Sequence, residues 1–351
     1  MKSELDKCIG CKKPACVGCP AGTDIASVIA LVKEGKRAEA GEMLFNNNPF
    51  SAICGAVCPN HLFCMPSCIL SKRDNAVNFS QIEAEISGEY LEKMPARGLI
   101  DSSAKVLIIG AGVAGLSLAF YLGRAGIDAT VCDKRKRAGG SLWLIPDSRL
   151  DKALVQKIID KIGVQIVHEE IDPANLPTGY DHIVFAIGSE VSNKLGIPGE
   201  NLLHVKCGLH FLEHEEAPVK NTLVIGGGNV AIDCAIVAKD KGSESVAICY
   251  RKTEEFLKAY PREIQHVKDL GVCFHFNMVP TKITKKFVHF DNGKKLPADR
   301  VIVAIGQYSN TLPEGELHLI GDVAHGPSTI IKAVASAKQM AEKIKNSYIK
   351  A

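Results

Sequence analysis

Two glycine-rich segments, 116 residues apart, constrain the fold of this chain more than any other feature. The first reads Gly-Ala-Gly-Val-Ala-Gly over 110–115, and the second reads Gly-Gly-Gly-Asn-Val-Ala over 226–231. Each follows a β-branched run and opens a helical pattern, and a further apolar strand comes after that helix. This order of strand, turn, helix and strand, present twice, predicts an α/β fold with two Rossmann-like domains, each on a parallel sheet.

The expected elements follow from this periodicity. In the first unit we expect a strand over 105–109, a helix over 115–125 and a strand over 128–133; in the second, a strand over 222–225, a helix over 230–240 and a strand over 245–250. The segment before them is rich in cysteine and has helical patterns over 24–34, 37–46 and 79–93. Residues 95–103 contain proline, glycine and serine, and indicate a linker.

The two glycine loops differ in the residues that end the strand after each helix. Asp133 follows Gly110 by 23 residues. A carboxylate at that place hydrogen-bonds ribose hydroxyls and repels a 2′-phosphate, so the first site suits FAD or NAD. The corresponding strand of the second unit ends in Arg251 and Lys252, with no acid, which suits the 2′-phosphate of NADPH. The alternative is that these two cations form a solvated turn.

Thirteen cysteines are unusual for a chain of this composition, and eight of them form two runs near the N-terminus. The runs are Cys8, Cys11, Cys16 and Cys19, then Cys54, Cys58, Cys64 and Cys68. In ferredoxin-type runs the last cysteine, followed by proline, binds the other cluster. We therefore expect one 4Fe–4S cluster on Cys8, Cys11 and Cys16, and a second on Cys19, Cys58, Cys64 and Cys68. The first set lacks one ligand, and Cys54 and Glu83 are both candidates.

Zinc is the main alternative for the cysteines, because four thiolates also make zinc sites. The uneven spacings and the two Cys-Pro pairs favour clusters. No signal peptide is visible, so we expect a cytoplasmic chain and no disulfide framework. The five scattered cysteines are expected mostly in the core. A net charge of +3 argues against nucleic acid and membrane surfaces, and glycines interrupt the apolar stretch 106–122 too often for a membrane span.

With these motifs the chain resembles the small (beta) subunit of NADPH-dependent glutamate synthase. It is also similar to the large subunit of NADH-dependent ferredoxin:NADP oxidoreductase and to the N-terminal half of dihydropyrimidine dehydrogenase. The resemblance covers nearly the whole chain. Besides the cysteine runs and glycine loops, the matching segments are 48–50, 139–140, 145–146, 195–200, 250–251, 304–307, 320–322 and 326–334.

The resemblance implies a domain plan and two sets of binding residues. A helical cluster domain (1–95) would precede an FAD domain (104–215 and 309–351), with an NADPH domain (216–308) inserted in it. The implied FAD residues are Gly110, Gly112, Ala114, Gly115, Asp133, Lys134, Gly140, Ser141, Ala186, Gly188, Gly321, Asp322, Ser328 and Thr329. The implied NADPH residues are Gly226, Gly228, Asn229, Val230, Asp233, Arg251, Lys252 and Gly306.

The resemblance also implies a reaction. A hydride would pass between NADPH and FAD, and the clusters would carry single electrons to or from other redox subunits, with ferredoxin one candidate partner. No catalytic triad is needed for this, because the cofactors supply the chemistry. Such a subunit would serve an electron-bifurcating transhydrogenase or a glutamate-synthase-like complex. The chain lacks an amidotransferase or FMN-barrel domain, so we expect it to need a partner.

The chain departs from the family pattern in two ways. Cys16 and Cys19 are one residue closer, and the segments after Arg149, around 282–290 and before Leu319 are shortened, so we expect hairpins to be missing there. Two other readings remain: a thioredoxin-reductase-like disulfide reductase, and a zinc-bearing scaffold without activity. The first needs a redox Cys-x-x-Cys beside the flavin, which the second nucleotide domain lacks. Intact phosphate loops and Asp322 argue against the second.

Overall fold

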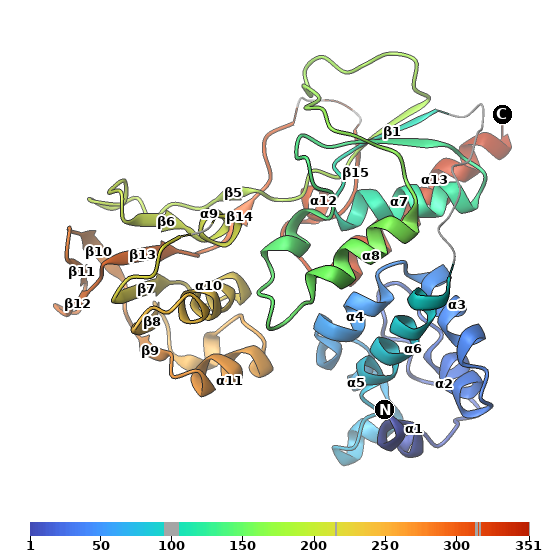
Figure 1. The fold of residues 1–351 in the computed structure, drawn as a ribbon, viewed down its shortest axis with the longest axis horizontal. Coiled ribbons are helices and arrows are strands. Elements are labelled where there is room, and N and C mark those ends of the chain that lie inside the picture. Colours follow the sequence, from blue (N-terminus) through green and yellow to red (C-terminus); the bar gives the residue numbers. More distant parts are fainter. Residues whose placement is uncertain (95–104, 215, 313–314, 316, 351) are drawn as a thin grey trace. The chain divides into compact units, whose positions relative to one another are not determined.

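The computed structural model describes residues 1–94, 105–214, 216–312, 315 and 317–350 (Figure 1). Its contacts divide the chain into two compact units. Unit 1 consists of Met1–Trp143, Asp147–Ser189 and Ser309–Ala351, and unit 2 of Leu144–Pro146 and Glu190–Tyr308. Unit 2 is therefore inserted in unit 1, and it takes in residues 190–215 in addition to the 216–308 expected from the sequence. The linker expected over 95–103 lies outside the described residues.

The N-terminal part of unit 1 is helical. Its elements are α1 (Lys2–Lys7), α2 (Ile25–Lys33), α3 (Arg37–Asn47), α4 (Ser51–Val57), α5 (Cys64–Ser67) and α6 (Phe79–Lys93), with 3-10 turns η1 (Asn60–Leu62) and η2 (Ile69–Arg73). Asp24 caps α2 by accepting the backbone N–H of Ser27 at 3.0 Å, as the sequence predicts. The apolar faces of α2, α3 and α6 share one core, which includes Val28, Leu44 and Ile82.

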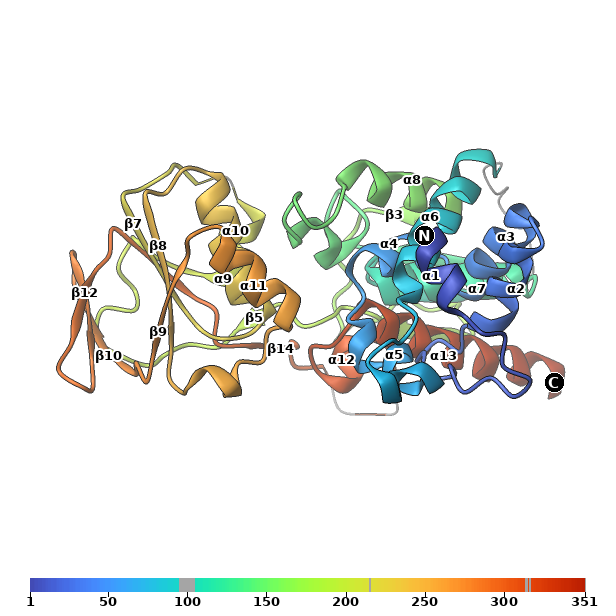
Figure 2. The ribbon, with the colours of Figure 1, turned by 90° about the horizontal axis from the view of Figure 1, so that it is seen from below.

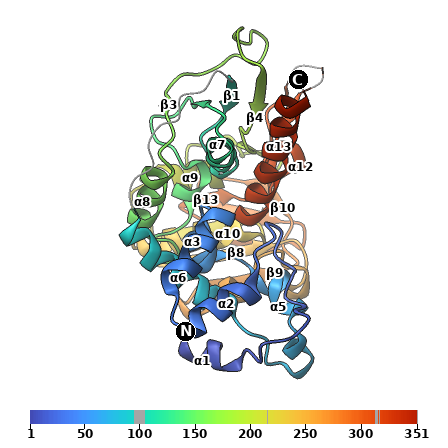
Figure 3. The ribbon, with the colours of Figure 1, turned by 90° about the vertical axis from the view of Figure 1, so that its right-hand side faces the viewer.

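The rest of unit 1 is built on a five-stranded parallel sheet of order β15-β4-β1-β2-β3. The strands are β1 (Val106–Ile109), β2 (Ala129–Cys132), β3 (Ile166–Val167), β4 (His182–Phe185) and β15 (His318–Leu319). Its helices are α7 (Val113–Arg124), α8 (Lys152–Ile162), α12 (Asp322–His325) and α13 (Ile330–Lys350), with the 3-10 turn η3 (Gly140–Leu144). Helix α13 packs along α7 (Figure 3).

Unit 2 has a second parallel sheet, of order β6-β13-β7-β8-β9. The strands are β6 (Val205–Cys207), β7 (Asn221–Ile225), β8 (Ser245–Tyr250), β9 (Cys273–Phe276) and β13 (Arg300–Val303). Helices α9 (Gly208–Glu213), α10 (Asn229–Asp240) and α11 (Pro261–Asp269) cover one face (Figure 2), and η4 (Glu254–Phe256) follows β8. A two-stranded antiparallel ribbon joins β5 (Val191–Ser192) and β14 (Gln307–Tyr308).

A small antiparallel sheet covers the other face of the unit 2 sheet (Figure 2). It consists of β10 (Pro280–Ile283), β11 (Phe287–Phe290) and β12 (Lys295–Pro297). Val288 and Phe290 pack against the strand residues on that face. The expectation that residues around 282–290 lack a hairpin was therefore wrong: the alternation of apolar residues in β11 keeps one side buried.

The apolar stretch 106–122 is divided between β1, the glycine loop and α7. Across the parts of the chain that the structure describes, no helix is both long and apolar enough to cross a membrane.

Candidate cofactor sites

The two glycine loops have the same construction. Gly110 has φ +112°, and a Cβ there would lie 2.5 Å from the carbonyl oxygen of Ala186. Gly226 has φ +151°, and its Cβ would lie 2.2 Å from the carbonyl oxygen of Ala304. Ala186 follows β4 and Ala304 follows β13, so each loop presses against the end of the neighbouring strand. Only glycine fits at this first position of either loop.

The glycine just before the helix in each loop faces open space. Gly112 precedes α7 and Gly228 precedes α10, and a Cβ on either would meet no atom within 4 Å. This is where the backbone of the fingerprint lets a pyrophosphate approach a helix N-terminus. The residues present therefore fit a dinucleotide at both sheets.

Asp133 closes the first loop from the end of β2. One oxygen of its carboxylate accepts the backbone N–H of Ala111 at 2.6 Å, and the other accepts that of Arg135 at 2.8 Å. The backbone N–H of Gly139 donates to the carbonyl oxygen of Ala111 at 2.7 Å. The structure thus brings the expected residues Gly110, Gly112 and Asp133 together at the carboxyl ends of β1 and β2.

A second polar group of unit 1 surrounds Asp322. Its carboxylate accepts the backbone N–H and the hydroxyl of Ser328, and burial raises the pKa of this carboxyl while those two hydrogen bonds oppose the rise. The hydroxyls of Ser189 and Ser309 both donate to its carbonyl oxygen. The Oγ1 atom of Thr329, just before α13, is buried and has no hydrogen-bond partner in the described part of the chain. This orphaned donor fits a polar ligand.

A cavity of about 340 Å³ opens beside the Asp322 loop. Gly321 and Ser328 line it, as expected from the sequence. His325 and Lys332 line it too, and sequence reasoning missed both because neither belongs to the fingerprint residues that identified the site. The backbone N–H of Gly321 donates to the hydroxyl of Ser336 on α13 at 3.1 Å, which ties the loop to that helix.

The second loop is covered by the segment after β8. The backbone N–H groups of Lys258 and Ala259 donate to the carbonyl oxygen of Gly227, and the side-chain oxygen of Asn229 accepts the backbone N–H of Tyr260 at 3.1 Å. Arg251 and Lys252 stand at the start of this segment and are both exposed. Lys252 lies with its ammonium 5.0 Å from the ring centroid of Phe256.

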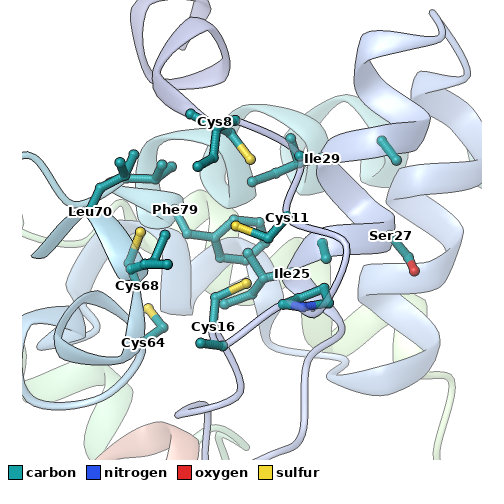
Figure 4. Close-up of a pocket in the computed structure, with 18 of the residues that line it drawn as sticks. Cys8, Cys11, Cys16, Ile25, Ser27, Ile29, Cys64, Cys68, Leu70 and Phe79 are labelled. Atoms are coloured by element: carbon teal, nitrogen blue, oxygen red, sulfur yellow. The ribbon is translucent and has the colours of Figure 1, made fainter.

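One set of thiols lines an apolar cavity in the helical part of unit 1. The cavity encloses about 390 Å³, and its walls include Ile25, Ile29, Leu70 and Phe79. Figure 4 shows the cysteines around it: Cys8, Cys11, Cys16, Cys64 and Cys68. Burial raises the pKa of Cys16, and the nearby thiols of Cys68, Cys8 and Cys11 raise it further. Five thiols line this apolar cavity, and four of them are a donor set that fits a 4Fe–4S cluster.

A second set lies around Glu83 on α6. Burial raises the pKa of the Glu83 carboxyl to about 8. Burial, and after it the charge of Glu83, also raise the pKa of Cys58, and they raise the pKa of Cys64 to about 12. The thiol of Cys19 acts on both in the same direction. Cys19, Cys58, Cys64 and Glu83 are therefore close neighbours. The thiol of Cys54 lies near them too, since burial and, after it, the charges of Glu83, Cys58 and Cys19 raise its pKa.

This grouping differs from the pairing expected from the sequence. Cys68 lies with Cys8, Cys11 and Cys16, and Glu83 lies with the second set. Cys68 follows α5 directly, and its thiol lies near that of Cys16. Cys54 is 1% exposed within α4, where Asn48 donates an amide hydrogen to its Sγ at 3.3 Å. Helix α4 packs closely on α6, which keeps this thiol in the helix interface.

The other cysteines follow the sequence expectation in part. Cys132, Cys234 and Cys249 are buried, whereas Cys207 is half-buried and Cys273 is exposed. All thirteen cysteines are free thiols. Among the described residues, no three histidine, cysteine or acidic side chains are arranged to hold a single metal ion.

The fold and the sites define a class of protein: an oxidoreductase with two Rossmann-like domains for FAD and a pyridine nucleotide, and a cysteine-rich helical domain. Residues 104–319 match the pyridine nucleotide-disulphide oxidoreductase family. Residues 1–94 match the 4Fe–4S cluster domain II of dihydropyrimidine dehydrogenase. The chain belongs to the pyridine nucleotide-disulphide oxidoreductase family. These matches confirm the predicted FAD, NAD(P)H and 4Fe–4S cofactors, and the clusters over zinc.

Similar proteins agree with the resemblance seen in the sequence. The chain is 27% identical to the glutamate synthase (NADPH) small chain of Escherichia coli K12, with 98% of this chain and 91% of that one covered. It is also 27% identical to the NAD-dependent dihydropyrimidine dehydrogenase subunit PreT of Salmonella typhimurium LT2, with 97% and 92% covered. The crystal structure of T. acidophilum thioredoxin reductase shares the fold over 70% of this chain, with a TM-score of 0.56 and 19% identity.

Proposed function

We propose that this chain is a cytoplasmic electron-transfer subunit that moves electrons between NADP(H) and a partner redox protein through FAD and two 4Fe–4S clusters. One observation carries the proposal. Both thiol sets and the Asp322 loop belong to unit 1, and α13 begins beside that loop and reaches the helical part through Lys338. A single helix thus connects the flavin loop to the cluster-binding segment.

The ligands of the clusters follow from the two side-chain sets. Cys8, Cys11, Cys16 and Cys68 would bind one cluster in the apolar cavity. Cys19, Cys58, Cys64 and Glu83 would bind the other, with the Glu83 carboxylate in the place of a fourth thiolate. Cys54 is left out of both, because its thiol is enclosed between α4 and α6.

The residues of the flavin site would bind and orient the cofactor. When bound, FAD supplies the conversion between a hydride and single electrons. The open backbone at Gly112 and the α7 N-terminus would hold the pyrophosphate, and Asp133 the ribose. Asp322 and Thr329 would face the other end of the cofactor, where the cavity beside α13 opens. Further FAD contacts proposed from the sequence are Ala114, Lys134, Gly140, Ser141, Ala186 and Gly188.

The nucleotide preference rests on the turn after β8. Arg251 and Lys252 are exposed there, and two cations beside the ribose would favour NADPH over NADH. The name of one relative specifies NADPH and that of the other specifies NAD, and a comparison of the two nucleotides tests the preference of this chain. Gly226, Gly228, Asn229, Val230, Asp233 and Gly306 complete the proposed site.

A partner is proposed because the relatives are named as a small chain and as a subunit. The partner would be another redox subunit, such as one of an electron-bifurcating or glutamate-synthase-like complex, or ferredoxin. A role in electron bifurcation would be contradicted if the isolated chain alone reduced its physiological acceptor at the full rate.

Anaerobic purification tests the proposal. We expect about one FAD and about eight iron atoms per chain, the latter because each of the two clusters contains four, and bleaching of the flavin by NADPH at lower concentration than by NADH. A colourless protein, or a flavoprotein without iron, would contradict it. Other redox chains that co-purify from the native host would identify the partner.

A further inference from the structure

Helix α13 makes polar contacts with the helical part of unit 1 through one lysine. The Nζ atom of Lys338 donates to the carbonyl oxygen of Ala21 at 3.1 Å and to the Oδ1 atom of Asn47 at 2.6 Å. The lysine is half-buried. Burial lowers the pKa of Lys338, and the thiol of Cys19 opposes that effect, so the ammonium is within electrostatic reach of this cysteine.

The hydrogen bonds continue from Asn47 to the cysteine. The Nδ2 group of Asn47 donates to Oγ1 of Thr23 at 3.0 Å, and Oγ1 of Thr23 is 3.3 Å from the Sγ atom of Cys19. Thr23 is 6% exposed. A cluster-bound Cys19 is a thiolate without a proton, so the Thr23 hydroxyl must then donate to the sulfur. Every donor in this line then points from the ammonium towards the sulfur.

Helix α7 holds the middle of this line in place. The hydroxyl of Tyr121 donates to the backbone carbonyl oxygen of Asn47 at 2.5 Å, and Arg124 donates to the side-chain oxygen of Asn46. Two helices of the flavin-binding part therefore fix the end of α3. Contacts from α7 and from α13 therefore hold the Asn47 amide between Lys338 and Thr23.

This series of hydrogen bonds has a physical consequence for a cluster bound through Cys19. Hydrogen bonds to ligand sulfurs and nearby positive charge stabilise the more negative, reduced state, and so raise the reduction potential. Hydrogen bonds in a chain polarise one another in the same direction. Lys338 lies about 12 Å along α13 from the start of the helix, at a rise of 1.5 Å per residue. Helix α13, which begins at the Asp322 loop, therefore places the Lys338 ammonium within electrostatic reach of Cys19.

We propose that Lys338, Asn47 and Thr23 form a tuning line that raises the reduction potential of the cluster bound through Cys19, so that one electron is transferred to this cluster more readily than to its neighbour. The inference rests on the proposed function, since it needs a cluster on Cys19. Lys338 and Asn47 are positioning residues here: they act on the cluster through Thr23 and do not touch it.

Redox titration of the anaerobic holoprotein, followed by the EPR signals of the reduced clusters, tests the tuning line. The variants are Lys338→Met and Thr23→Val, which remove the charge and the hydroxyl at nearly constant volume. Thr23→Ser keeps the hydroxyl and serves as the conservative rescue. Lys343→Met makes the same charge change at an exposed position of α13 and is the matched control.

We expect Lys338→Met and Thr23→Val each to lower the potential of one cluster, with an approximately tenfold change in its reduction equilibrium, which is about 59 mV for one electron. The other cluster, the Thr23→Ser variant and the Lys343→Met control should keep wild-type potentials. Unchanged potentials in both loaded variants would overturn the tuning line. Loss of a cluster in both would also overturn it, because the line would then be a structural tie.

The experiment distinguishes a failure of the proposed function from a failure of the tuning line. A wild-type protein without cluster signals would contradict the proposed function itself. If the wild-type protein shows two cluster signals, and substitution of Lys338 or Thr23 changes neither potential, the proposed function stands and only the tuning line is contradicted.

Discussion

Ser328 donates two hydrogen bonds to one oxygen of the Asp322 carboxylate, from its backbone N–H at 3.0 Å and from its hydroxyl at 2.8 Å. These bonds close the loop between Gly321 and the first turn of α13. Gly321 has φ +71°, and a Cβ there would lie 2.8 Å from that of Ala114 on α7. The loop is therefore held between two helices of the flavin-binding part, and its carboxylate is fixed before a cofactor arrives.

Asp322→Ala should weaken FAD retention at least about tenfold, because hydrogen bonds to a charged group contribute roughly 1.5–3 kcal/mol. Ser328→Ala should have a smaller effect, since it removes the hydroxyl and keeps the backbone N–H. Flavin content after gel filtration, with FAD titrated back, gives the measurement. Asp160→Ala, an exposed site on α8, is the control. Full flavin content in Asp322→Ala would refute this role.

Gly226 and Gly228 in the second loop should respond differently to alanine. Gly226→Ala forces a side chain into φ +151° and against the carbonyl oxygen of Ala304, and should destabilise unit 2 by about 1–3 kcal/mol. Gly228→Ala meets no atom within 4 Å and has φ −104°, so it should keep the stability and raise the KM for NADPH. Thermal unfolding and steady-state kinetics separate the two. Equal loss of stability in both variants would contradict the structure of the loop.

Cys68→Ala and Cys54→Ala test the proposed ligand sets. Cys68→Ala removes a thiol from the apolar cavity, and we expect it to lose one cluster, seen as about half of the iron and one missing EPR signal. Cys54→Ala should keep both clusters, since that thiol is enclosed in the α4–α6 interface. Loss of iron in Cys54→Ala would contradict these ligand sets and would make Cys54 a cluster ligand, one of the two candidates expected from the sequence.

Arg251→Ala should raise the KM for NADPH about 10- to 100-fold and leave the KM for NADH nearly unchanged, because only NADPH carries the 2′-phosphate. Lys294→Ala, an exposed lysine elsewhere in unit 2, controls for the change in charge. A parallel rise for both nucleotides would contradict binding of the 2′-phosphate, and unchanged KM values for both would show that Arg251 belongs to a solvated turn.

Local features of the fold could be predicted from the sequence. Helix α6 and strand β8 have the predicted bounds, because helical and strand periodicities are set by neighbouring residues. The Gly110 and Gly226 loops were predicted because a fingerprint between a strand and a helix is a local signal. The inserted order of the domains came from the family resemblance.

The partners of the cysteines could not be predicted in the same way. Whether Cys68 or Cys54 joins Cys16 depends on how α4, α5 and α6 pack, and no spacing rule contains that packing. Lys338 was missed because it lies about 290 residues from Asn47 in the sequence, and nothing local marks the pair. The sheet β10–β12 was missed because the segment around 282–290 is short compared with the family pattern. The alternation that buries one face of β11 was not taken into account.

Rapid-freeze EPR after anaerobic mixing with NADPH follows the electrons from the nucleotide to the clusters within one chain. We expect the flavin to bleach and signals of reduced 4Fe–4S clusters to appear afterwards, before any partner is added. Bleaching of the flavin with clusters present but still oxidised, at potentials where dithionite reduces them, would contradict an electron path from FAD to the cysteine-rich domain.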